Sequence, residues 1–136
     1  MILRTDSLPW PISSKLRHLI QEELVKATVP PGTGAIFTFK DPTYSMTTGG
    51  FHPVEISISA DGGIEYITDF AYVGSSTYSE LAKEIDFDIS LGLFQHFGQE
   101  YPILAGRELF QLWESNFVTY YGMGVYTVSV EPFTEG

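Results

Sequence analysis

Alternating apolar and polar residues between residues 52 and 73 predict a β-hairpin. Two runs of this alternation flank the turn sequence Asp61-Gly62-Gly63. A period of two residues places every second side chain on the same face of a sheet. We therefore expect one face of the hairpin to be buried under helices through Val54, Ile56, Ile58, Tyr66 and Phe70.

The register of this hairpin follows from the side chains that it buries. A three-residue loop, Asp61-Gly62-Gly63, keeps the apolar residues of both strands on one face, and glycine supplies the left-handed conformation that such loops need. The expected pairs are Ala60 with Ile64, Ile58 with Tyr66 and Val54 with Phe70. On the other face this register sets Glu55 opposite Asp69, where like charges destabilise a pair by up to about 1 kcal/mol.

Two segments carry apolar residues at the three- and four-residue spacing of an amphipathic helix. The apolar positions are Leu16, Leu19, Ile20, Leu24 and Ala27 in residues 13–28, and Leu109, Phe110, Trp113, Phe117, Tyr120 and Tyr121 in residues 107–121. Ser13 or Ser14 can cap the first helix. Because an aromatic stripe of this kind covers the apolar face of a sheet, we assign it to the core and not to a cofactor site.

Three further segments complete the predicted fold. Residues 35–40, at least the first half of residues 85–97, and residues 124–130 have the composition of strands. Helix, meander, helix and strand in this order predict an α+β protein with an antiparallel sheet of about four to six strands and two main helices on one face. We expect residues 1–136 to form a single domain, with residues 1–12 partly irregular.

Composition and charge narrow the classes of partner. The chain has 136 residues, a net charge of −10 and no cysteine, which excludes disulfides and thiolate metal sites. Residues 41–136 hold two basic residues against fourteen acidic ones. Such a surface repels nucleic acid and favours basic proteins or cations. The N-terminal residues do not resemble a signal peptide and no apolar run is long enough to span a membrane, so we expect a cytoplasmic protein without a membrane partner.

The acidic residues of the predicted sheet have three interpretations. Glu55, Glu65 and Asp69 lie on the polar face of the hairpin, and Asp86 and Asp88 join them if residues 85–89 form the next strand. The face can be a solvated surface whose repulsion is screened by salt. It can instead dock a basic protein partner. As a third alternative, Glu55, Asp69, Asp86 and Asp88 can form a divalent-cation site or a carboxylate-based active site.

The sequence contains no established catalytic motif. It lacks the nucleophile elbow, the phosphate-binding loops and the zinc-binding HExxH pattern. The histidines are His18, His52 and His96, and spacing gives none of them a catalytic partner. His52 can ligate a metal, but alternation directs it to the face opposite Glu55. We therefore predict no catalytic residue, no bound metal and no cofactor.

Several motifs together resemble a known family. They are Phe51-His52-Pro53-Val54-Glu55, Thr68-Asp69-Phe70, Asp86-Phe87-Asp88, and Phe110-Gln111-Leu112-Trp113 with Asn116-Phe117. This pattern resembles a bacterial family known as domain of unknown function 2787, over roughly residues 10–131. The resemblance implies a compact α+β domain carried by mobile genetic elements, with no assigned reaction or catalytic residue. Interference with host or phage machinery is a role consistent with such an origin.

Two hypotheses for function remain. The first is a non-enzymatic binding or inhibitor protein whose acidic sheet face, formed by Glu55, Glu65, Asp69, Asp86 and Asp88, meets a basic protein. The second is a small carboxylate enzyme or a cation-binding protein that uses Glu55, Asp69, Asp86 and Asp88. The two differ in whether these carboxylates converge in a pocket or spread over an open surface.

Overall fold

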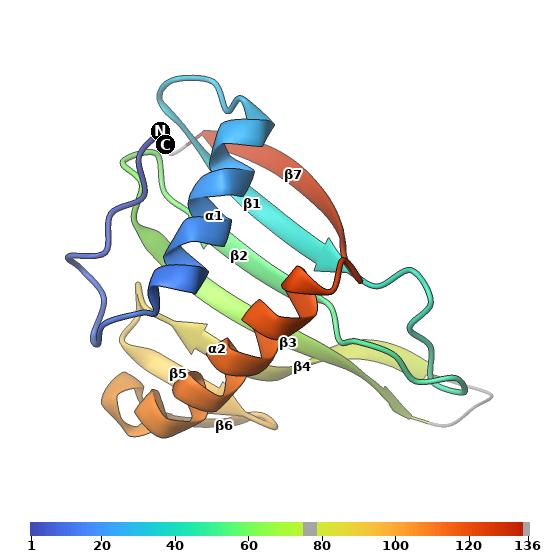
Figure 1. Ribbon diagram of the computed structural model, residues 1–136. Helices are drawn as coiled ribbons and strands as arrows, with labels where there is room; N and C mark the ends of the chain where they lie inside the picture. Colours follow the sequence, from blue (N-terminus) through green and yellow to red (C-terminus); the bar gives the residue numbers. More distant parts are fainter. Residues whose placement is uncertain (75–78, 135–136) are drawn as a thin grey trace.

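The computed structural model describes residues 1–74 and 79–134 and shows an α+β protein (Figure 1). Its helices are α1 (Ser14–Ala27), the short 3-10 helix η1 (Ile103–Gly106) and α2 (Arg107–Gly122). Its strands are β1 (Thr33–Lys40), β2 (Val54–Ile58), β3 (Ile64–Gly74), β4 (Ser79–Asp88), β5 (Leu93–His96), β6 (Gln99–Pro102) and β7 (Thr127–Thr134). They form one antiparallel sheet in the order β6-β5-β4-β3-β2-β1-β7.

The predicted class, an antiparallel sheet with two main helices on one face, is confirmed, since α1 and α2 lie across the same face (Figure 1). Over the residues that the structure describes, the sheet has seven strands instead of four to six. In residues 85–97, at least the first half was predicted as a strand; this range contains the end of β4, a turn and then β5. The edge strand β6 was not predicted, because all four of its residues are exposed and no apolar alternation marks it.

Helix α1 forms as its sequence predicts. The Ser13 hydroxyl accepts a hydrogen bond of 3.0 Å from the Leu16 N–H, which caps the first turn. The apolar stripe is buried against the sheet through Leu16, Leu19, Ile20 and Leu24. The helix stops at Thr28, which has a left-handed φ of 52° and precedes the pair Pro30-Pro31.

Aromatic side chains of α2 and the sheet form the centre of the core. Phe110 meets Phe87 of β4 edge-on with ring centroids 5.1 Å apart, and Phe117 meets Phe39 of β1 in the same way at 5.1 Å. Trp113 stacks on Phe117 between these two contacts. Within residues 1–74 and 79–134, no helix is both long and apolar enough to cross a bilayer.

The β2–β3 hairpin has a different register from the predicted one. Ile58 pairs with Ile64, but Ser57 pairs with Tyr66, so Glu65 is an extra residue in β3. A hydrogen bond of 2.8 Å from the Ser59 N–H to the Gly63 carbonyl closes a loop of residues 60–62 instead of 61–63. The predicted pairs of Ala60 with Ile64, Ile58 with Tyr66 and Val54 with Phe70 are therefore wrong.

This β-bulge at Glu65 reverses the faces of the rest of β3, because an extra residue breaks the period of two. Ile67 and Asp69 now lie on the face covered by the helices. Tyr66 and Phe70, expected in the core, are half-buried on the other face. The remaining predicted core residues are buried as expected: Val54, Ile56 and Ile58.

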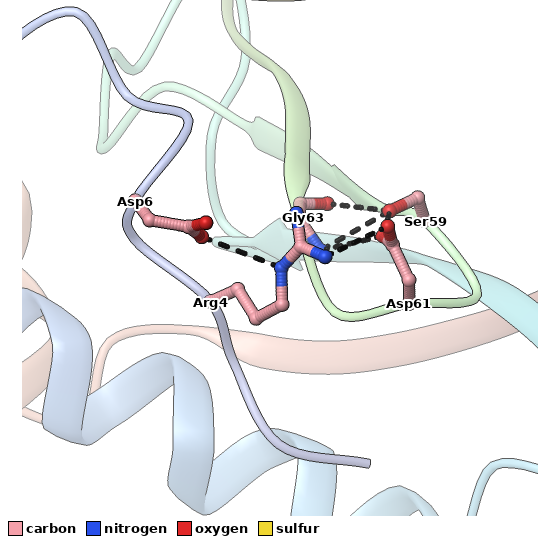
Figure 2. Close-up of polar contacts among 5 residues, drawn as sticks. All are labelled: Arg4, Asp6, Ser59, Asp61 and Gly63. Carbon is pink, nitrogen blue, oxygen red and sulfur yellow. Dashed lines mark hydrogen bonds and ion pairs between the residues drawn. The ribbon is translucent and has the colours of Figure 1, made fainter.

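The N-terminal segment crosses the tip of this hairpin (Figure 2). Its backbone meets the loop where the Arg4 N–H donates to the Gly62 carbonyl at 2.8 Å. The Arg4 guanidinium lies 3.1 Å from Asp61, whose carboxylate accepts the Ser59 hydroxyl. These contacts tie an irregular segment to the sheet, and they require a loop without a side chain at Gly62, where φ is +91°.

Candidate functional site

The open face of the sheet, the one that neither α1 nor α2 covers, carries most of the predicted acidic residues. Four of the five lie there: Glu55, Glu65, Asp86 and Asp88. Cross-strand pairing places Glu55 and Asp86 in one row, with Thr68 between them. Asp88 lies in the next row, opposite Tyr66. The acids therefore spread over adjacent strands and do not converge on one point.

Hydroxyl groups order the carboxylates of the open face. The hydrogen bonds run from Tyr66 to Glu55 at 2.6 Å, Ser57 to Glu65 at 3.0 Å, Thr68 to Asp86 at 2.8 Å and Ser90 to Asp88 at 2.7 Å. Burial, together with the bond to Glu55, raises the pKa of Tyr66, which keeps the phenol protonated as a donor. Among the described residues, Lys83 is the only cation that contacts this set, 3.6 Å from Asp86.

Asp69 does not belong to the open face, contrary to the prediction. The bulge at Glu65 turns its side chain toward α2, where the Trp113 indole N–H donates to Asp69 Oδ2 at 3.1 Å. The predicted cation site of Glu55, Asp69, Asp86 and Asp88 is therefore wrong in its geometry. The sheet itself separates Asp69 from the other three carboxylates.

On the helix-covered face, His52, Asp69 and Glu84 form a compact group that we call the His52 cluster. His52 Nδ1 lies 3.1 Å from Asp69 Oδ1 and 2.8 Å from Glu84 Oε2. One nitrogen and one oxygen from each carboxylate lie within 4.8 Å of one another. All three side chains are partly buried, with exposed fractions of 39%, 15% and 21%.

The loop between β1 and β2 holds His52 in this place. Asp41, which is buried, accepts hydrogen bonds from the Phe51 N–H at 3.0 Å and the Thr43 N–H at 2.9 Å. Gly50 has a φ of +129°, and a Cβ there would lie 2.9 Å from Asp41 Oδ2. Asp41 thus closes the loop immediately before His52 and fixes where its ring enters the cluster.

A second β-bulge brings Glu84 to the cluster. β3 and β4 pair Asp69 with Ile85 but Phe70 with Lys83, which leaves Glu84 as an extra residue of β4. Without the bulge, strict alternation along β4 would put Glu84 on the open face, because its neighbour Ile85 lies on the helix side. Bulges commonly direct a side chain toward a functional site.

The His52 cluster opens into a pocket with a volume of about 330 Å³. Aromatic and aliphatic side chains from the β1–β2 loop, α2 and the segment before β7 form its walls: Phe51, Leu109, Leu112, Trp113, Phe117, Tyr120 and Tyr126. Besides the Trp113 N–H and the hydroxyls of Tyr120 and Tyr126, its polar groups are those of the cluster and of Asn116 in α2. An apolar pocket with a few convergent polar groups is the usual form of a small-ligand site.

Two carboxylates raise the pKa of His52 above its ordinary value. The largest cause is the hydrogen bond to Asp69, which partial burial of the ring opposes, and the negative charges of Asp69 and Glu84 add to it. Imidazole binds a metal ion only through an unprotonated nitrogen, so a proton and a metal ion would compete for Nδ1. The cluster is therefore suited to holding a cation, or a proton in its place.

Sequence reasoning found only part of this site. It directed His52 to the face opposite Glu55, which is confirmed, but it then found no ligand partner there. The apolar residue Ile67 could have revealed the position of Asp69. If Ile67 is buried, then Asp69, two residues later in β3, must share its helix-covered face. No pattern in the sequence indicated the orientation of Glu84, because this residue precedes the clear alternation of residues 85–89.

Solved structures similar to this chain come from Vibrio cholerae. The hypothetical protein VC0508 from the VSP-II pathogenicity island is 38% identical with a TM-score of 0.78, over 95% of this chain and 98% of its own. The conserved hypothetical protein VC1805 from pathogenicity island VPI-2 is 39% identical with a TM-score of 0.77, over 89% of this chain and 95% of its own. The latter is described as sharing structural homology with the human P32 protein.

Among curated proteins, none matches this chain. A family model described as Protein of unknown function (DUF2787) matches residues 14–131. That range begins at the start of α1 and ends within β7, so it includes both helices and all three residues of the His52 cluster. The chain therefore belongs to the DUF2787 family.

Proposed function

We propose that this protein is a binding protein that holds a basic segment of a protein partner against the open face of its sheet. The observation that carries the proposal is the hydroxyl-ordered set of carboxylates Glu55, Glu65, Asp86 and Asp88. Neutral donors fix the position of a carboxylate without cancelling its charge. Of the four, Asp86 is only 5% exposed and lies beside Lys83, so Glu55, Glu65 and Asp88 carry the accessible charge. The face therefore keeps a negative potential that attracts lysine and arginine.

The arrangement in rows favours a segment with several basic residues over a single cation. Strands lie about 4.8 Å apart, so Glu55 on β2 and Asp86 on β4 are separated by roughly 10 Å. That spacing is too wide for both to hold one ion. The partly exposed carboxylates Glu55, Glu65 and Asp88 lie on three adjacent strands, which suits successive side chains of a lysine- or arginine-rich segment. Arginine, whose planar group binds a carboxylate through two hydrogen bonds, is the favoured contact.

The origin of the relatives supports an inhibitory role for this binding. Both Vibrio cholerae proteins with similar structures come from pathogenicity islands. We infer that this chain belongs to the same kind of mobile element and acts by covering a basic surface of a host or phage protein. No reaction is part of this proposal.

A charge-matched pair of variants tests the proposal. One variant, E55Q/E65Q/D86N/D88N, neutralises the open face; the other, D6N/E22Q/E80Q/E108Q, removes the same charge from exposed residues elsewhere. Each is titrated with a fluorescent peptide rich in lysine and arginine, by anisotropy, at low and high salt. We expect the first variant to lose binding, the second to retain it, and the wild-type affinity to fall as salt rises.

Equal weakening in both variants would show attraction to net charge without a defined face, and would overturn the proposal. So would wild-type binding that does not change with salt. Thermal unfolding of both variants serves as the folding control. Because the amides can still accept the hydroxyl hydrogen bonds, we expect both variants to fold.

A further inference from the structure

We propose that His52, Asp69 and Glu84 form a binding site for a divalent transition-metal ion, with Zn²⁺ as the first candidate. This site lies on the opposite side of the sheet from the acidic open face and does not depend on the function proposed for that face. It would supply three protein ligands: one imidazole nitrogen and one oxygen from each of two carboxylates.

The distances between the ligand atoms suit a common ion. Ligands that bind zinc at about 2.0–2.2 Å in tetrahedral geometry lie roughly 3.3–3.6 Å from one another, a few tenths of an ångström farther apart than the ligand atoms here. Nδ1 lies 3.1 Å from Asp69 Oδ1 and 2.8 Å from Glu84 Oε2. Small side-chain adjustments would therefore let an ion replace the proton that Nδ1 shares with these oxygens.

The ligand types select the class of metal. Mg²⁺ and Ca²⁺ take oxygen ligands almost exclusively, whereas an imidazole nitrogen favours zinc and its first-row neighbours. Two carboxylates beside one imidazole offset the charge of a divalent ion. Three protein ligands with a remaining open position are characteristic of zinc sites that bind a further small ligand.

The surroundings of the cluster support the assignment independently of its distances. The Trp113 N–H binds Asp69 Oδ2, the oxygen that does not contact His52, and so fixes the orientation of this carboxylate. Outer hydrogen bonds of this kind orient the ligands of metal sites. Asp41 restrains the loop that ends at His52, and the bulge in β4 presents Glu84. Each of the three ligands is thus positioned by a separate structural feature.

The pocket gives the proposed ion access to a small molecule. The cluster lies against the apolar space lined by Phe51, Trp113 and Tyr120, so an open coordination position would face this space. A small molecule with one metal-binding group and an apolar body would contact both the proposed ion and the apolar walls of the pocket. The site is therefore proposed as a place where metal and small ligand bind together.

The test begins with protein freed of metal by a chelator and then titrated with Zn²⁺ by calorimetry, with Mg²⁺ and Ca²⁺ as hard-cation comparisons. We expect one equivalent of Zn²⁺ to bind, and we expect H52Q, D69N and E84Q each to weaken it about tenfold or more. H96Q, which removes a histidine outside the cluster, and E55Q, which removes a charge from the open face, should bind as wild type does. W113F should keep one equivalent at reduced affinity.

A second measurement uses the wild-type chain, so it does not depend on variants that fold. Co²⁺ should produce visible absorption bands that saturate at one equivalent and disappear when Zn²⁺ displaces it. In NMR spectra, Zn²⁺ should move the ring resonances of His52 and leave those of His18 and His96 in place. Absence of saturable binding, or binding removed by H96Q but not by H52Q, would overturn the metal site and leave the cluster as an ion pair.

Discussion

The indole of Trp113 and the carboxylate of Asp69 are joined by a hydrogen bond of 3.1 Å that links α2 to β3. Trp113 is 6% exposed and stacks on Phe117, so its ring also belongs to the core. One side chain thus connects the packing of the helix to the orientation of a cluster residue. Loss of this bond should affect both stability and the His52 cluster.

We expect Trp113→Phe to destabilise the protein by about 1–3 kcal/mol, because Asp69 Oδ2 loses its donor in a partly buried place. Urea denaturation measures the change. A double-mutant cycle with Asp69→Ala separates the hydrogen bond from the loss of ring volume. If Trp113→Phe has the same effect in both backgrounds, the bond contributes nothing and packing explains the whole change.

The corrected register predicts different effects for two neighbouring residues of β3. Ile67 is 1% exposed and lies under the helices. Ile67→Ala should therefore destabilise the fold by about 2–5 kcal/mol. Phe70→Ala should have a smaller effect although it removes a larger side chain, since Phe70 is half-buried on the open face. Chemical denaturation of both variants gives the comparison. A larger loss of stability for Phe70→Ala than for Ile67→Ala would contradict the observed register and support the one expected from simple alternation.

Substitutions at Gly62, in the hairpin loop, and at Gly63, directly after it, should have different effects. Gly62 has a φ of +91°, and a Cβ there would lie 2.1 Å from the Ile2 carbonyl oxygen. At Gly63 the nearest atom would be the Ser59 hydroxyl at 3.3 Å. We therefore expect Gly62→Val to lower the melting temperature most, Gly63→Val less, and Asp61→Asn least. Equal tolerance of the two valine variants would contradict the observed contact between the N-terminal segment and the loop.

Asp41 should make the protein sensitive to acid. Its hydrogen bonds from Phe51 and Thr43 lower the pKa of the folded carboxyl, so its stabilising effect is complete above the unfolded pKa of about 3.9. That effect is lost as pH falls through the lower, folded pKa. Urea midpoints measured from pH 6 down to pH 2 should therefore fall more steeply for the wild type than for Asp41→Asn. Parallel curves would mean that the folded state does not perturb this carboxyl.

Patterns within single segments were enough to predict both main helices and the α+β class, but not the strand β6 or the register of the β2–β3 hairpin. Leu16, Leu19 and Leu24 mark α1 because their spacing matches the helical period, and Phe110, Trp113 and Phe117 mark α2 in the same way. These patterns act within one element, so they can be recognised without knowledge of its neighbours. The motifs that resemble the family were likewise continuous stretches, and the family assignment is confirmed.

The face that each acidic residue occupies depends on how the strands pack together across the whole sheet. Glu65 and Glu84 are extra residues in their strands, and each changes the side of the sheet on which nearby side chains lie. A period of two cannot reveal such an insertion, because the bulge is selected by packing of the whole sheet against α1 and α2. The meeting of His52, Asp69 and Glu84 depends on both bulges and on the loop closed by Asp41, so it arises only when the three segments fold together.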